Sequence, residues 1–306
     1  MQTAAELSEI FTIPGCLTFD EPHPGMPCAH ITTAVCTAEL YLQGAHLTQW
    51  QPAGQEPVLF LSGRSAFTPG KAIRGGIPVI FPWFGAPDTS PVHPPAGSSS
   101  HGYARIWPWT LRFAALAGDD LHLSLTLDHN ARLHALGFDF LQLGIDIMLG
   151  RNLSVRLTAA NAGAVPFLFE EALHAYLNLS QIDQVSIQGL QETEFLDKTD
   201  GFQRKKQTDP VLTFSTETDR PYLNTSSPVS LTDPVLKRRL LLTKTNSQTT
   251  VIWNPAAALT ARLPDLAPGD WQHFACMETA NAAENAVTLQ PGEAHTMSMH
   301  LSVDPL

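Results

Sequence analysis

The sequence predicts an all-β fold, a large sandwich or barrel of strands with few short helices. Apolar and polar residues alternate with a period of two in several segments, as in strands with one buried face. The 306 residues include 24 Pro and 20 Gly, which is typical of a chain with many turns. Strands and helices do not alternate regularly, which argues against an α/β barrel or a doubly wound sheet.

The individual elements follow from local patterns along the chain. Residues 3–11 are expected to form a short helix, and residues 129–137 a helical turn or two. The clearest alternating patterns predict strands over these segments: 121–128, 141–147, 153–159 and 297–303. Turn-forming clusters separate the strands at these positions: 118–120, 199–201, 225–228, 266–270 and 290–293.

Residues 62–110 form the most irregular part of the sequence. They include seven prolines from Pro69 to Pro95 and three consecutive serines at 98–100. A long irregular stretch inside a compact domain is often functional. No linker, repeat or change in composition divides the chain, so we expect one domain over 1–306, with its motif-bearing core at about 30–303.

The charge of the chain limits the classes of partner. Lys and Arg number 18 and Asp and Glu number 29, so the formal net charge is −11. Nucleic acids and anionic membranes need clustered basic surface, so we expect neither as a partner. An anionic ligand would have to be held by a few well-placed Arg or Lys side chains.

Targeting signals and cysteine spacing point to a cytoplasmic protein. No apolar stretch approaches the roughly 20 residues of a membrane span, and the N-terminus lacks a basic region followed by an apolar run. The four cysteines, at positions 16, 28, 36 and 276, are unevenly spaced and form no CxxC pair. We therefore expect buried free thiols in a reducing compartment.

Two arginines stand out in the irregular part of the chain. Arg74 precedes Gly75 and Gly76 in an otherwise apolar stretch, and its planar guanidinium suits a carboxylate or a phosphate. The alternative is an Arg paired with a structural carboxylate. Arg105 lies four residues after His101, and the two would share one face if the segment were extended. The alternative for His101 is a structural hydrogen bond.

The segment 169–176 carries His174 shortly after Glu170 and Glu171. Histidine exchanges protons readily near neutral pH, so this string suits acid/base chemistry. The alternative is that the two glutamates belong to a solvated strand edge.

The segments 274–281 and 251–255 hold two further candidates. Glu278 interrupts an apolar, strand-like run, where burial would raise its pKa toward the range of a general base. The alternative is a glutamate at a strand end that faces water. Trp253 offers a stacking surface for a sugar ring, although tryptophan is more often a core residue.

Motifs for metals, nucleotides and covalent nucleophiles are missing from the sequence. It contains no HExxH, no paired CxxC, no GxSxG, and neither GK[ST] nor GxGxxG spacing. We therefore predict no cofactor and no metal. The residues alone indicate a β-rich protein with a His and Glu acid/base pair and two loop arginines.

Eight segments, taken together and in order, resemble one family. These are GAHLTQWQP at 44–52, RGGIPVIFPWFG at 74–85, HGYAR at 101–105, EEALHAYLNLS at 170–180, LDKTDG at 196–201, DRPYLN at 219–224, VIWNP at 251–255 and CMETANA at 276–282. The set is similar to the D-hexose-6-phosphate mutarotases of the aldose 1-epimerase, galactose-mutarotase-like superfamily. The second and third segments resemble the hexose-phosphate branch in particular. Thr279 and Ala280 replace the Pro-Gly of fungal-type members, as in the bacterial branch.

The resemblance implies a single antiparallel β-sandwich with a sugar site in a cleft on one sheet. It implies His174 and Glu278 as the catalytic residues. It also implies the following substrate-binding residues: Arg74 and Arg105 for a phosphate, and His101, Asp219 and Trp253 for the sugar. A turn-forming Asp is the alternative at position 219, and the role of Asp197 and Lys198 stays open.

The implied reaction is the interconversion of the α and β anomers of a hexose 6-phosphate, here glucose 6-phosphate, by a monomeric enzyme. Glu278 would act as base and His174 as acid in opening and closing the ring. The alternatives are a non-catalytic carbohydrate-binding or sensing protein, and an epimerase of unphosphorylated aldoses. A third is a glycoside hydrolase that uses Glu170 or Glu171 with Glu278.

Overall fold

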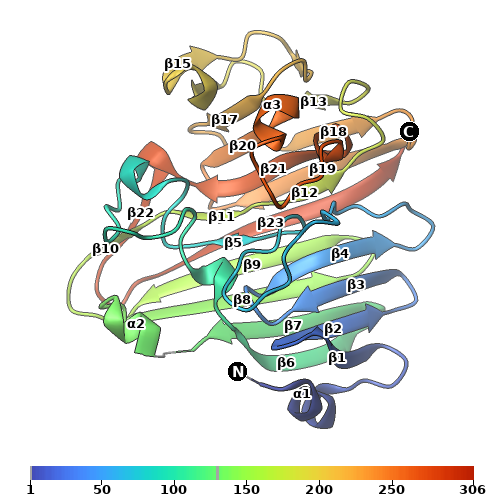
Figure 1. The fold of residues 1–306 in the computed structure, drawn as a ribbon, viewed down its shortest axis with the longest axis vertical. Helices are drawn as coiled ribbons and strands as arrows, with labels where there is room; N and C mark the ends of the chain where they lie inside the picture. The colour runs from blue at the N-terminus through green and yellow to red at the C-terminus, as the bar shows by residue number, and fades with distance from the viewer. Residues whose placement is uncertain (1, 129–130) are drawn as a thin grey trace.

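Two layers of antiparallel strands make up the protein in the computed structural model, which describes residues 2–128 and 131–306. Figure 1 shows the strands of both layers running across the molecule, with the short helices and long loops around them. The prediction of an all-β antiparallel sandwich is confirmed.

The first layer is a nine-stranded sheet with β16 at one edge and β6 at the other. Its strands, in spatial order, are β16 (Val211–Leu212), β13 (Ser186–Gln188), β18 (Val229–Asp233), β19 (Arg238–Thr245), β23 (Ala294–Pro305), β9 (Leu153–Asn161), β8 (Leu141–Leu149), β7 (Asp120–Leu127) and β6 (Thr110–Ala117). The four strands predicted from alternation are β7, β8, β9 and β23, so these predictions are confirmed.

The second layer combines an eight-stranded and a four-stranded sheet. The eight strands are β15 (Gln203–Lys206), β14 (Glu194–Asp197), β17 (Thr218–Tyr222), β20 (Thr249–Asn254), β21 (Phe274–Asn281), β11 (Glu171–Leu173), β5 (Val79–Ile80) and β12 (Tyr176–Asn178), which also pairs with β21. The four are β1 (Leu17–His23), β2 (Met26–Thr32), β3 (Cys36–Tyr41) and β4 (His46–Pro52). A bridge between Leu47 and Ile77 joins the two sheets. A further pair, β10 (Phe167–Phe169) and β22 (Val287–Leu289), forms a small separate sheet.

Helices are short in the described residues. They are α1 (Ala4–Phe11), α2 (Ala131–Ala135) and α3 (Ala256–Thr260), with 3-10 turns η1 (Pro87–Thr89), η2 (Ala104–Ile106), η3 (Lys198–Asp200), η4 (Asp270–His273) and η5 (Ala283–Asn285). The predicted helix at 3–11 is confirmed, and a capping box of Thr3 with Glu6 defines its start. The predicted turn at 129–137 is matched by α2, while residues 129–130 lie outside the described residues. Among the helices that the structure describes, none is long and apolar enough to cross a membrane.

The core lies between the two layers and is built from both. Trp50 of β4 donates a hydrogen bond from its indole nitrogen to the carbonyl of Gly150, in the turn between β8 and β9 of the nine-stranded sheet. The main cluster of buried apolar side chains takes residues from every large sheet, among them Leu47, Leu123, Ile145, Leu157, Ile252 and Met277. All four cysteines are buried and free, as predicted.

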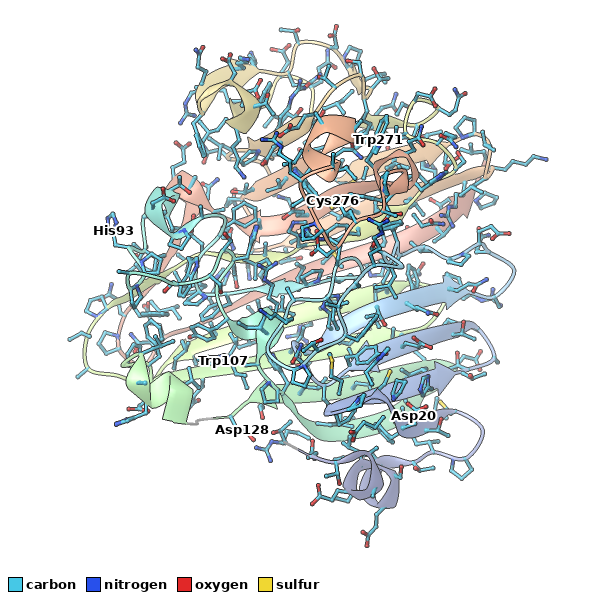
Figure 2. The ribbon with its side chains drawn as sticks, in the orientation of Figure 1. Asp20, His93, Trp107, Asp128, Trp271 and Cys276 are labelled. Carbon is cyan, nitrogen blue, oxygen red and sulfur yellow. The ribbon has the colours of Figure 1, made fainter. Side chains whose placement is uncertain are left out.

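Strand β21 is buried along its whole length. Ala275 and Met277 point into the main core. Because side chains alternate across a strand, Cys276 and Glu278 point to the opposite, outer face of the sheet. Figure 2 shows Cys276 near the centre of the view. The outer face of β21 does not pack against the other layer, yet its side chains are buried. Loops therefore cover that face.

The irregular segment predicted at 62–110 supplies much of that cover. It holds only β5 and two 3-10 turns before β6 begins at Thr110. Gly75 and Gly76 have positive φ angles of 118° and 61°. A Cβ atom would collide with the carbonyl of Phe60 at Gly75 and with that of Leu47 at Gly76. Only glycine fits this close approach.

A buried carboxylate anchors the loop that follows β5. Glu170 is 2% exposed and accepts hydrogen bonds from the Phe84 amide (2.9 Å), the Ser90 hydroxyl (2.6 Å) and the Ala283 amide (2.7 Å). The alternative that Glu170 belongs to a solvated edge is therefore wrong. Sequence reasoning missed its burial because its partners lie far along the chain.

Replacing Glu170 with Ala is expected to lower the free energy of unfolding by about 3 kcal/mol, because three donors lose a charged acceptor in a buried site. Urea unfolding would measure the loss. Glu9→Ala, at an exposed position of α1, serves as the control and should change the stability little. Equal, small losses for both variants would contradict the anchoring role.

Candidate active site

Four predicted site residues meet on the outer face of the eight-stranded sheet. Asp219 of β17 is directly opposite Trp253 of β20, and Trp253 is opposite Cys276 of β21. Glu278 follows two positions later on the same face of β21, and His174 leaves the end of β11 beside it. Strand pairing thus brings together residues that are far apart in sequence.

His174 and Glu278 form a buried pair. The Nε2 atom of His174 lies 3.2 Å from Oε1 of Glu278, and the side chains are 8% and 1% exposed. The alternative that Glu278 faces water is therefore wrong. Within the described residues, His174 Nδ1 and Glu278 Oε2 have no hydrogen-bond partner. Each of these two buried atoms therefore keeps an unused hydrogen-bonding position.

The surroundings shift the pKa values of Glu278 and His174 in the directions that favour the neutral form of each side chain. Burial raises the pKa of Glu278 well above its ordinary value, and the nearby charge of Asp219 raises it further, while Lys198 opposes this. Burial lowers the pKa of His174 well below its ordinary value, and Arg105 and Arg74 lower it further. Both shifts favour the neutral forms, a protonated Glu278 and an unprotonated His174. That proton can lie on either partner without changing the net charge of the pair.

Aromatic rings hold the imidazole of His174 in place. The ring of Tyr176 stacks on it with centroids 4.9 Å apart and planes inclined by 16°. Trp253 and His101 approach it edge-on, at 6.0 Å and 5.6 Å. Tyr176 was part of a motif in the sequence, but nothing in that string identified it as a site residue.

The segment 101–105 is not extended. His101 has a φ angle of 65° and Arg105 lies on the 3-10 turn η2. The condition under which they would share a strand face is therefore not met, because the chain turns at Gly102, against the carbonyl of Phe81. His101 Nδ1 accepts a hydrogen bond from the amide of Gly85 at 3.3 Å, so it has the structural contact considered as an alternative as well as its contact with His174.

The two arginines differ in their partners. Arg74 contacts Asp265 at 3.0 Å and donates to the Tyr176 hydroxyl at 2.9 Å. Arg74 thus has the carboxylate partner that the alternative interpretation expected.

Arg105 donates to the carbonyl of Ser100 at 2.8 Å. Its Nε atom is buried without a partner, and the guanidinium forms no ion pair with any described residue. Burial lowers the pKa of Arg105 to about 10, with a further contribution from the charge of Arg74. It remains cationic at neutral pH, and the charges of Tyr176 and Asp265 act on it in the opposite direction and raise its pKa, although neither forms an ion pair with it.

Asp219 lies within strand β17, so the alternative of a turn-forming Asp is wrong. Its Oδ2 atom pairs with Nζ of Lys198 at 2.8 Å. Sequence reasoning quoted Lys198 but assigned it no role. Asp265, the partner of Arg74, was missed altogether, because its string has no distinguishing pattern.

The geometry does not suit a glycoside hydrolase pair. Glu171 points into the interior of the sandwich, where its Oε1 contacts Asn281 (2.8 Å) and His295 (2.9 Å). It therefore lies on the face opposite to Glu278. Glu170 is held by its three hydrogen bonds. In the described part of the chain, no cluster of three or more His, Cys, Asp or Glu is arranged to hold a metal ion.

Comparison with known proteins places this arrangement in a family. The model of the aldose 1-epimerase family matches residues 27–302, most of the sequence. The chain belongs to the aldose 1-epimerase family. It is an epimerase, and the family resemblance read from its motifs is confirmed.

Relatives and solved structures agree with this assignment. Two relatives are named "Putative glucose-6-phosphate 1-epimerase": one from Escherichia coli (strain K12), 34% identical over 84% of each chain, and one from Cenchrus ciliaris, 30% identical over 88% of this chain and 82% of its own. A crystal structure described as a "putative mutarotase" from Salmonella typhimurium superposes with a TM-score of 0.88 at 28% identity, covering 97% of this chain and 96% of its own. A galactose mutarotase-like protein from Lactobacillus casei shares the fold, with a TM-score of 0.70 at 17% identity over 92% of this chain and all of its own.

Proposed function

We propose that this epimerase interconverts the α and β anomers of a hexose 6-phosphate, with glucose 6-phosphate as the substrate. The observation that carries the proposal is the buried contact of 3.2 Å between His174 and Glu278, with the unpaired Arg105 in the same site. The names given to the relatives from Escherichia coli and Cenchrus ciliaris support the same substrate.

Ring opening requires one proton to leave and another to arrive. Glu278, as a carboxylate, takes the proton of the C1 hydroxyl while His174, as an imidazolium, protonates the ring oxygen. The C1–O5 bond breaks, a C1 aldehyde forms, and rotation about C1–C2 exposes its other face. Ring closure returns both protons and yields the other anomer. The pair is neutral overall before and after each step, which suits a buried site.

The phosphate is proposed to bind at the arginines. Arg105 forms no ion pair with a carboxylate of the described residues, and an anion would give its partly buried guanidinium a direct counter-charge. Arg74 already pairs with Asp265. It also donates a hydrogen bond to the hydroxyl of Tyr176, whose ring stacks on His174. We therefore assign the larger share of phosphate binding to Arg105. Asp219 and Trp253 line the sugar side of the same face.

Replacing Arg105 with Ala is expected to raise KM for glucose 6-phosphate about tenfold or more, since about 1.4 kcal/mol of lost binding is tenfold. Activity toward free glucose should stay the same, because free glucose offers no phosphate. Arg105→Lys should recover part of the loss, because an ammonium lacks the planar fork. Exchange NMR between the anomers of each sugar measures these rates.

Arg151→Ala is the matched control, since Arg151 is exposed on the turn between β8 and β9. It should behave as wild type on both sugars. Equal losses for Arg105→Ala on phosphorylated and free glucose would reject the phosphate role. That result would favour an epimerase of unphosphorylated aldoses.

A further inference from the structure

Lys198 is the motif residue to which the proposed function assigns no role. It opens the 3-10 turn η3 at the end of β14. The Asp197 side chain caps this turn by accepting hydrogen bonds from the Thr199 amide (3.1 Å) and hydroxyl (2.6 Å). Gly201, with a φ of 61°, ends it. The cap therefore determines where the Lys198 side chain begins.

The ammonium of Lys198 is held between two elements of the site. Its Nζ lies 2.8 Å from Oδ2 of Asp219, on β17, and 5.7 Å from the ring centroid of Phe84, in the loop after β5. The side chains of Lys198 and Asp219 are 24% and 18% exposed. Such a half-buried pair is less screened by water and salt than one on the open surface.

Asp219 and Glu278 lie on the same outer face of the eight-stranded sheet, on β17 and β21, with β20 between their strands. The negative charge of Asp219 raises the pKa of Glu278, and the positive charge of Lys198 lowers it. Two carboxylates in the same buried site disfavour each other's charged form. A cation paired with the outer carboxylate reduces that repulsion.

Other ionisable groups also face Glu278 or its partner His174. From the remaining elements around the pair, these are Tyr176 on β12, Cys276 on β21, Asp219 on β17, His101 and Arg105 on the loop before β6, and Arg74 on the loop before β5. They stay unchanged in the variants below, apart from Asp219. A shift on removing Lys198 therefore reports on the Lys198–Asp219 pair.

We propose that Lys198 is a positioning residue for catalysis, which pairs with Asp219 so that Glu278 does not face an uncompensated negative charge. Lys198 thereby sets the pH range in which Glu278 can accept a proton from the sugar. The inference rests on the proposed function for the role of Glu278 as the base. The electrostatic part does not need a substrate, so it can be tested separately.

The test is the titration of Glu278, followed by ¹³C NMR of protein labelled at the glutamate side-chain carboxyl carbon, with Glu278→Gln to assign the signal. In Lys198→Met, the titration midpoint should move up by about 0.5–1 pH unit, because removal of a nearby positive charge disfavours the carboxylate. Asp219→Asn should move it down, and the double variant should return it toward wild type. Lys198→Arg, which keeps the charge, should stay close to wild type.

The acid side of the kcat/KM profile for glucose 6-phosphate should move in the same directions. Lys206→Met is the matched control. Lys206 lies on β15, next to β14, and the substitution removes its exposed ion pair with Glu192. In Lys206→Met, the titration midpoint of Glu278 should not move. An unshifted midpoint in Lys198→Met, or no return in the double variant, would overturn the inference. An active Glu278→Gln variant would instead reject the proposed base, whatever the titration shows.

Discussion

Glu278→Gln is expected to reduce kcat for anomer exchange of glucose 6-phosphate by at least about 10²-fold, the contribution of a positioned general base. Glutamine has nearly the same volume and can keep the contact with His174, but it cannot accept the proton of the C1 hydroxyl. The fold should persist, because Glu278 is surrounded by well-packed neighbours on β20 and β21. Exchange NMR at equilibrium measures the rate directly.

Two controls make this result interpretable. Glu56→Gln, at an exposed position, should leave the rate unchanged. Calorimetric binding of glucose 6-phosphate to Glu278→Gln should persist, since the phosphate is held elsewhere in the site. If Glu278→Gln keeps more than roughly a tenth of the wild-type kcat, Glu278 is not the base.

His174→Asn is expected to reduce kcat by a similar factor, about 10²-fold or more, because the ring oxygen loses its proton donor. Asparagine also gives up the stacking on Tyr176, so the remaining amide is less well placed. The pH dependence should change shape, since the pair that shares one proton in the wild type no longer exists. A full kcat profile from pH 5 to 9 would measure this.

The pH profile separates two roles for His174. If the variant is slow but keeps the wild-type pH profile, His174 only orients the sugar. His300→Asn, on an exposed position of β23, should match wild type in both rate and profile. A melting curve for each variant shows whether a lost rate reflects lost fold.

The family resemblance identified the residues, but the sequence could not place their neighbours. His174 and Glu278 were predicted from their motifs, and the structure brings them into contact. Tyr176 and Asp265 touch the same site, yet their strings gave no reason to select them, and Lys198 was named without a role. Their roles depend on side chains from other strands. Arg74 and Asp265, for example, are 191 positions apart.

Local sequence patterns were enough to predict the all-β fold class of this protein. Alternation along 121–128, 141–147, 153–159 and 297–303 predicted strands that the structure confirms, because a half-buried strand leaves a period of two in its own sequence. The short helix at 3–11 was also predicted. It too depends on local sequence, since its capping residues are neighbours along the chain.

Only the tertiary structure decided which charges are buried and which are paired. Glu170 and Glu171 are adjacent, yet one anchors a loop and the other points between the sheets. Strand alternation sends adjacent side chains to opposite faces, and the loops and sheets that cover each face come from distant parts of the chain. Burial and charge pairing set the proton affinity of a carboxylate. The chemical character of Glu278 therefore arises from the fold, although its identity as a candidate was readable from the sequence.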